Sequence, residues 1–150
     1  MNEVVTKENI KIEDMIYEIR GKQVMLDSDL AILYECANGT KTINQAVKRN
    51  INRFPNDFYF QLETEEFLNL KSQIGTSSWN NYGGIRKLPY VFTEQGVAML
   101  ATVLRTDIAS EMSVAIMRAF VTMRKYISTN LLEQKYINNM VLEHDCQINY

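Results

Sequence analysis

The feature that most constrains the fold is the run from Val97 to Tyr150, which contains neither glycine nor proline. The residues that most often interrupt a helix are therefore missing from more than a third of the chain. Within the run, apolar residues recur three or four positions apart, as they do on one face of an α-helix. They are Ile108, Met112, Ala115, Ile116, Ala119, Phe120, Met123 and Ile127. The sequence predicts a helical C-terminal half.

The residues before this run predict small strands and short helices. IYEIRGKQVML (residues 16–26) alternates in polarity on both sides of a turn at Gly21-Lys22, which indicates a β-hairpin. FYFQL (58–62) and LPYVF (88–92) read as further strands, followed by helices that start at Thr64 and Thr93. We expect an α+β fold in which a small β-hairpin and strands, with a helix-turn-helix-like pair, precede the helical C-terminal half.

The helix-turn-helix-like pair is predicted between the hairpin and the strand at 58–62. Asp27 suits the N-cap of the first helix, and Asn38-Gly39 suits its end. The second helix starts at Thr40 or Thr42, where Gln45 completes a capping box with Thr42, and it stops before Pro55. A turn of three or four residues between the two helices is typical of a helix-turn-helix.

Length and composition indicate a soluble, cytoplasmic protein with one main domain. The chain has 150 residues and two cysteines, Cys36 and Cys146, which indicate reduced thiols instead of a disulfide framework. It has no signal-peptide pattern, and no apolar run approaches the roughly 20 residues of a membrane span. We expect a charged leader at 1–14, a folded domain at 15–127 and a helical tail at 128–150. The tail is either the start of a coiled coil or a linker to a further C-terminal region.

The charge of the chain is unevenly distributed, although its net value is only −2. Residues 36–56 carry four basic side chains and no acid, and residues 67–93 carry three and no acid. Residues 57–66, between them, carry four acids and no base. Chance alone can produce short acid-free windows, so the geometry of each window decides its meaning.

On a helical wheel, the second helix of the pair has one apolar and one basic face. Ile43, Ala46, Val47, Ile51 and Phe54 form the apolar face, which docks on the first helix. Asn50 is the one polar residue on that face, and it is either a hydrogen-bonded buried amide or a base reader. The basic face consists of Lys41, Asn44, Gln45, Lys48, Arg49, Asn52 and Arg53.

The basic face has the chemistry that duplex DNA requires, with an ordinary solvated surface as the alternative. Lysine and arginine bind phosphates, arginine also pairs with guanine, and asparagine and glutamine match adenine. We therefore expect base contacts from Asn44, Gln45 and Arg49, and phosphate contacts from Lys41, Lys48 and Arg53.

The second basic window contains Lys71, Arg86 and Lys87, which bracket Trp79 and Tyr82 in a glycine-rich loop. These three cations are expected to hold an adjacent stretch of DNA backbone. The alternative is a surface loop with Trp79 packed against the core.

Several runs in order resemble the KilA-N type DNA-binding domain, in its ORF-six-N branch, over about residues 15–127. They are RGKQVMLDSDLAILYE, TKTINQAVKRNINRFPNDFYFQL, SQIGTSSW, RKLPYVFTEQGVAML and IMRAFVTMR. The family's NQAVKRN-type helix falls on residues 44–50, and its LPYxFTEQGVAML strand and helix fall on residues 88–100. The resemblance implies an α+β DNA-binding module of phage and prophage regulatory proteins, some of which are described as antirepressors.

Enzymatic chemistry has little support in the sequence. His144 is the only histidine, the cysteines form no CxxC motif, and Gly83-Gly84 lacks the rest of a phosphate-binding loop. Helix capping accounts for Asp27 and Asp29. We expect no enzymatic activity, no cofactor and no metal.

The sequence predicts a sequence-specific double-stranded DNA-binding protein of phage or prophage type, acting as a transcriptional regulator or antirepressor. The alternative function is a protein-interaction module, in which an antirepressor binds a repressor protein without reading DNA. A homodimer through the C-terminal helices is a further prediction, based on a weak apolar spacing in the tail. The residues with this spacing are Leu131, Leu132, Ile137, Val141 and Ile148.

Overall fold

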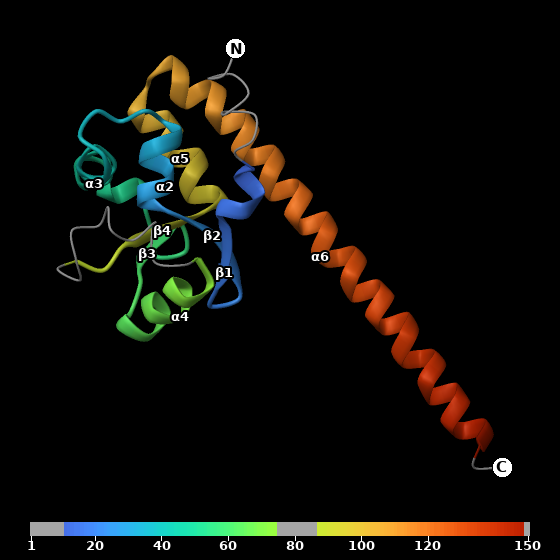
Figure 1. The fold of residues 1–150 in the computed structure, drawn as a ribbon. Helices are drawn as coiled ribbons and strands as arrows, with labels where there is room; N and C mark the ends of the chain where they lie inside the picture. The colour runs from blue at the N-terminus through green and yellow to red at the C-terminus, as the bar shows by residue number, and fades with distance from the viewer. Residues whose placement is uncertain (1–10, 75–86, 149–150) are drawn as a thin grey trace, which may run out of the picture.

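The computed structural model describes residues 11–74 and 87–148, with the side chains of 73, 74 and 128–148 left out. Four strands and a larger helical part confirm the predicted α+β class (Figure 1). The elements, with η for a 3₁₀-helix, are η1 (Ile12–Met15), β1 (Ile16–Ile19), β2 (Lys22–Leu26), α2 (Asp27–Leu33), α3 (Thr40–Arg49), η2 (Ile51–Arg53), β3 (Tyr59–Gln61), α4 (Thr64–Ile74), β4 (Tyr90–Thr93), α5 (Glu94–Leu104) and α6 (Asp107–Ile148).

The strands form one antiparallel sheet in the order β1-β2-β4-β3. The predicted hairpin is confirmed, but its turn lies one residue earlier than expected. Ile19 pairs with Lys22, so Arg20 and Gly21 form the turn, with φ values of 56° and 73°. A two-residue turn with positive φ at both positions matches the right-handed twist of the strands it joins.

Helices cover both faces of the sheet. Met25 and Phe92 point to the face covered by α2, α3, α5 and the first half of α6, while Val24 and Val91 point to the face covered by α4. Figure 1 shows α4 on one side of the strands and the other helices on the opposite side. Because β2 and β4 are central strands, both of their faces are buried, and so Met25 is in the core and not on a polar side with Gln23.

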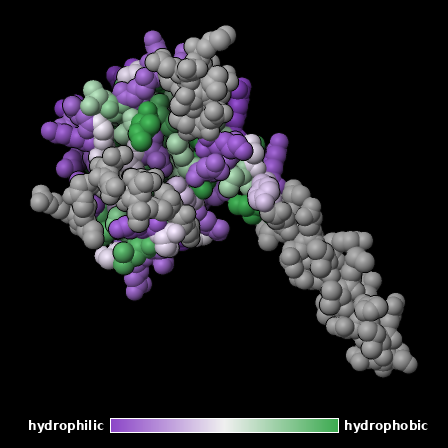
Figure 2. All heavy atoms as spheres, viewed as in Figure 1, coloured by the Kyte–Doolittle hydropathy of each residue, from purple (hydrophilic) through white to green (hydrophobic). Residues whose placement is uncertain are grey.

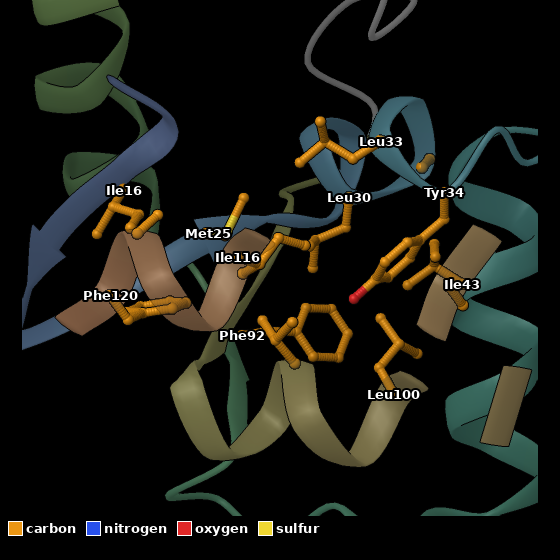
Figure 3. Packing of buried hydrophobic residues seen from close by; sticks show 14 of the residues in the cluster. Ile16, Met25, Leu30, Leu33, Tyr34, Ile43, Phe92, Leu100, Ile116 and Phe120 are labelled. Atoms are coloured by element: carbon orange, nitrogen blue, oxygen red, sulfur yellow. The ribbon is translucent and has the colours of Figure 1, made fainter. Parts of the chain in front are cut away.

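The larger core converges on Phe92 of β4 (Figure 3). Each helix on that face contributes at least one fully buried side chain to it. They include Leu30 of α2, Ile43 of α3, Leu100 of α5, and Ile116 and Phe120 of α6. These long-range apolar contacts supply most of the favourable free energy of folding.

The C-terminal half is helical, as predicted, but it is divided between α5 and α6. Arg105 ends α5 in the left-handed conformation, with φ 55°. The hydroxyl of Thr106 then accepts a hydrogen bond from the N–H of Ala109, at 3.1 Å, in the manner of an N-cap. Beyond the core, α6 extends away from the domain (Figure 1).

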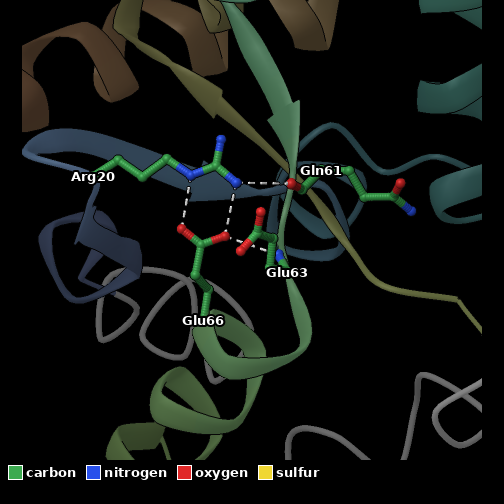
Figure 4. Close-up of polar contacts among 4 residues, drawn as sticks. All are labelled: Arg20, Gln61, Glu63 and Glu66. Carbon is green, nitrogen blue, oxygen red and sulfur yellow. Dashed lines mark hydrogen bonds and ion pairs between the residues drawn. The ribbon is translucent and has the colours of Figure 1, made fainter.

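Arg20 ties the hairpin turn to the first turn of α4 (Figure 4). Its Nε and Nη2 donate to the two carboxylate oxygens of Glu66, at 2.8 and 2.9 Å, and its guanidinium lies over the ring of Phe60. The hydrogen bond from Arg20 lowers the pKa of Glu66. Arg20 is therefore a structural cation that reaches over β3 to α4, although its side chain is 43% exposed.

Candidate nucleic-acid interface

Helix α3 lies at the edge of the domain and is held there by its apolar side. Ile43 and Val47 are buried against α2 and α5. The connection from α2 spans residues 34–39, which is longer than the predicted turn of three or four residues, because α2 ends at Leu33. Tyr34, which follows it, is buried and bonds through its hydroxyl to Ser113 of α6, at 3.1 Å.

The start of α3 differs from the prediction that a threonine caps it. Gly39, with φ 60°, is the N-cap residue, and no side chain bonds to the helix start. Thr40 is already helical, and the capping box of Thr42 and Gln45 does not form. Lys41 consequently belongs to the first turn of the helix and not to its cap.

The outward face of α3 is basic. Lys41, Gln45, Lys48 and Arg49 are exposed and recur at helical spacing, and Asn44 is half-buried beside them. In the described part of the chain, the two ion pairs are formed by Arg20 and Arg124, so none of the α3 cations is neutralised. The hydrophilic residues on this side of the molecule are visible in Figure 2.

Asn50 ends α3. Its side-chain Nδ2 donates to the carbonyl of Ala46, at 2.8 Å, and its own N–H bonds to Val47. The predicted hydrogen bond of the Asn50 amide is confirmed, but the residue is half-buried and not buried. Because the chain leaves the α-helix here, the prediction of one helix up to Pro55 is wrong.

The residues after Asn50 form η2 and keep the surface basic. Asn52 and Arg53 are exposed, Phe54 is buried at 3% exposure, and Ile51, expected on the apolar face, is 51% exposed. The exposed surface of α3 and η2, which we call the basic strip, combines four cations and three amides. Its members are Lys41, Asn44, Gln45, Lys48, Arg49, Asn52 and Arg53.

A row of aromatic rings connects Lys87 with the end of the basic strip. The ammonium of Lys87 lies 5.9 Å from the ring centroid of Tyr90, which stacks on Tyr59 at 5.5 Å. Tyr59 in turn meets the edge of Phe54, at 5.8 Å, and Phe54 directly follows Arg53. Lys87 therefore lies on the same face of the sheet as α3.

The other two cations of the second basic window are not placed with the strip. Lys71 is on α4, whose Phe67 and Leu70 pack on the opposite face of the sheet. Arg86 lies outside the described residues, as do Trp79 and Tyr82, so the interpretation of their loop stays a prediction.

Thr93, Glu94 and Asp27 have structural roles. Thr93 is the N-cap of α5, as predicted, and accepts a hydrogen bond from the N–H of Gly96. Glu94, next in sequence, pairs with Arg124 of α6 at one end of a groove of about 570 Å³ whose lining mixes acids and bases. Asp27 is the first residue of α2, not its N-cap, and its carboxylate accepts from the N–H groups of Ser28 and Tyr90.

Within residues 11–72 and 87–127, whose side chains the structure describes, no three His, Cys, Asp or Glu side chains lie close enough to hold a metal ion. No helix within residues 11–74 and 87–148 combines the length and apolar character needed to cross a bilayer. Burial raises the pKa of the Cys36 thiol, which makes the reactive thiolate scarcer.

Fold and surface together define a small α+β domain with a basic helix whose cations form no ion pair among the described residues. The family model of the ORF6N domain matches residues 14–103, and the chain belongs to this phage-type family. The predicted ORF-six-N branch is thereby confirmed, and the relation to KilA-N domains stays a prediction. No curated protein and no solved structure matches the chain. The matched residues include the whole basic strip and the aromatic row.

Proposed function

We propose that the chain is a non-enzymatic, sequence-specific double-stranded DNA-binding protein of phage or prophage type, which acts in the cytoplasm as a transcriptional regulator or antirepressor. The observation that carries the proposal is the basic strip, in which four cations and three amides follow one another along α3 and η2, with no acid among residues 40–53. Such a surface attracts phosphates and offers the donors and acceptors that match base edges.

The placement of Lys41 favours binding over stability. Lys41 lies in the first turn of α3, where the helix dipole disfavours positive charge, and the first turn holds no acid. A surface selected for stability alone would place acids there and form pairs between neighbouring turns. Lys48 and Arg49 lie in the last turn, where the dipole favours positive charge, so Lys41 is the cation of α3 that an anionic partner explains better.

The dimensions of α3 suit the major groove. Its 10 residues span about 15 Å, and a helix with side chains is about as wide as the groove. In this arrangement, Gln45 and Arg49, with Asn44 at the flank, contact base edges. Lys41, Lys48, Arg53 and Lys87 contact phosphates on the strands beside the groove, and Arg86 is assigned to the same role from the sequence alone.

A charge reversal on α3 tests the proposal. Wild-type protein should bind a random duplex of about 20 base pairs with a log–log salt slope of about −3.6 from Lys41, Lys48, Arg53 and Lys87, at about −0.9 for each phosphate contact, and of about −4.5 if Arg86 adds a fifth. The double variant Lys48→Glu with Arg49→Glu should lose most of this binding. The matched control is Lys22→Glu with Arg118→Glu, which changes the net charge equally at exposed cations outside the strip. Equal affinity of the two folded double variants would reject α3 as the binding surface.

A protein-interaction module remains the second candidate, because α5 and α6 expose an apolar surface. Val114 is 51% exposed and lines a groove of about 670 Å³ together with Met117 and Val121. In this alternative, an antirepressor contacts a repressor protein, or two copies join through their C-terminal helices. Pull-downs with and without nuclease separate the two functions, since a repressor contact survives removal of DNA and a DNA-mediated association does not.

A further inference from the structure

Ile51 occupies an unusual position for an apolar side chain. It is 51% exposed, whereas Phe54, three residues later in the same segment, is 3% exposed. The preceding Arg49 and the following Asn52 and Arg53 are also exposed, so Ile51 is an exposed apolar side chain between members of the basic strip in the sequence. Single exposed apolar residues are common, and the reason for this one must come from how it is held.

The exposure of Ile51 is a consequence of the way in which Asn50 ends α3. In a continuing helix, the N–H of residue 50 would bond to the carbonyl of Ala46. Here the side-chain amide of Asn50 takes that carbonyl, at 2.8 Å, and the backbone turns to φ −127° and ψ 35°. A continuing helix would instead have turned Ile51 toward the apolar side, in line with Val47.

The far end of the segment is also fixed. The N–H of Phe54 bonds to the carbonyl of Ile51, at 3.1 Å, and the Phe54 ring packs edge-on against Tyr59 and Phe92. Ile51 therefore lies on a short turn whose two ends are fixed. A side chain held in this way has a defined position, which it needs to distinguish partners of different shape.

We infer that Ile51 is a specificity-determining residue that packs against the C5-methyl group of a thymine in the major groove. This inference rests on the proposed function. Thymine presents the one methyl group among the base edges of that groove. The ammonium, guanidinium and amide groups of the strip pair with phosphates and hydrogen-bonding edges, whereas a methyl group is recognised by apolar contact. An isoleucine beside the end of the reading helix supplies the apolar contact that the strip lacks.

The probe is the duplex that wild-type protein selects from a random DNA pool, with each thymine replaced in turn by deoxyuracil. This replacement removes the methyl group and leaves the hydrogen-bonding edge unchanged. At one or two positions, the wild-type Kd should rise roughly fourfold, as expected for the loss of one buried methyl group. Ile51→Ala should bind the unmodified duplex correspondingly more weakly and show no further loss with deoxyuracil at those positions.

Two further measurements separate this inference from the proposed function. Ile51→Ala should keep wild-type affinity and salt slope on random duplex, because it removes no charge. Leu68→Ala, which truncates an exposed side chain on α4, is the matched control and should retain the full deoxyuracil effect. If no thymine position is sensitive, or if Ile51→Ala stays sensitive, the assignment of Ile51 is overturned while DNA binding stands. If wild-type protein binds no duplex, both proposals are overturned.

Discussion

The α-carbon of Gly96 lies so close to the main chain of Phe58 that a Cβ at position 96 would come within 2.0 Å of the Phe58 carbonyl oxygen. The same oxygen accepts hydrogen bonds from the N–H and the hydroxyl of Thr93, at 3.0 and 3.1 Å. The start of α5 is thus docked on the backbone that leads into β3. This docking fixes the segment after η2, and with it the end of the basic strip.

Gly96→Ala should accordingly destabilise the fold. The clash is with backbone, which cannot rotate away as a flexible side chain would, so we expect a loss of about 1–3 kcal/mol or more in the free energy of unfolding. Urea denaturation measures it. Ala98→Ser, at an exposed position on the same helix, should change stability by less than about 0.5 kcal/mol. A fully stable Gly96→Ala protein would show that α5 is not docked on Phe58.

Asp29 should make stability depend on pH. Burial, and secondly the carboxylate of Asp27, raise the pKa of Asp29 from 3.8 to about 6. Between these pH values Asp29 binds more protons in the folded protein than in the unfolded chain, so the contribution of Asp29 to stability is greatest below about pH 4 and is lost as the pH rises through 6. Asp29→Asn should be more stable than wild type at pH 7, on the order of 1–3 kcal/mol, and this gain should vanish below about pH 4.

Urea titrations at pH 4, 5, 6 and 7 test this prediction. Asp107→Asn, in the first turn of α6, controls for the general loss of a first-turn carboxylate, which costs only about 0.3–1 kcal/mol. An Asp29→Asn protein whose stability parallels that of wild type at every pH would contradict the raised pKa.

Local periodicity was enough to predict the hairpin, the buried face of α3 and the helical C-terminal half, because each depends on side chains within one element. What the sequence could not show depends on contacts between elements. Met25 is buried because β2 is a central strand, and the pattern of one strand does not reveal its neighbours. The break at Arg105 has no glycine or proline to mark it, although Thr106 offered an N-cap signal.

In the candidate site, too, features within one helix could be predicted, and features that depend on other contacts could not. The wheel identified the cations of α3 correctly as one exposed face, but it continued the helix past Asn50, where a side-chain hydrogen bond competes with the backbone. That error placed Ile51 in the core. Lys71 and Lys87 fall in the same basic window of the sequence, but the sequence does not show on which face of the sheet each residue lies.

The separation of Lys71 from Lys87 gives a third prediction. Lys87→Ala should weaken binding to random duplex and make the salt slope shallower by about 0.9, since it removes one phosphate contact beside the strip. Lys71→Ala should change neither, because α4 lies on the other face of the sheet. The two variants lose the same charge, so each is the control for the other. Equal effects would mean that the DNA surface is not confined to the α3 face.

Asn50 gives the last prediction, and Asn52 is its matched control. Asn50→Ala removes the hydrogen bond to the Ala46 carbonyl, and we expect a loss of about 0.5–1.5 kcal/mol in the free energy of unfolding. Asn50→Asp should lose about as much, because a carboxylate has no N–H to donate. Asn52→Ala removes an exposed amide and should stay within about 0.5 kcal/mol of wild type.

The two Asn50 variants should also bind the selected duplex more weakly. Without the Asn50 side-chain hydrogen bond, α3 can extend, which turns Ile51 inward and displaces Arg53. Urea denaturation of all three variants and their Kd values on the selected duplex test both effects. Wild-type stability in Asn50→Asp would show that the amide does not hold the end of the helix.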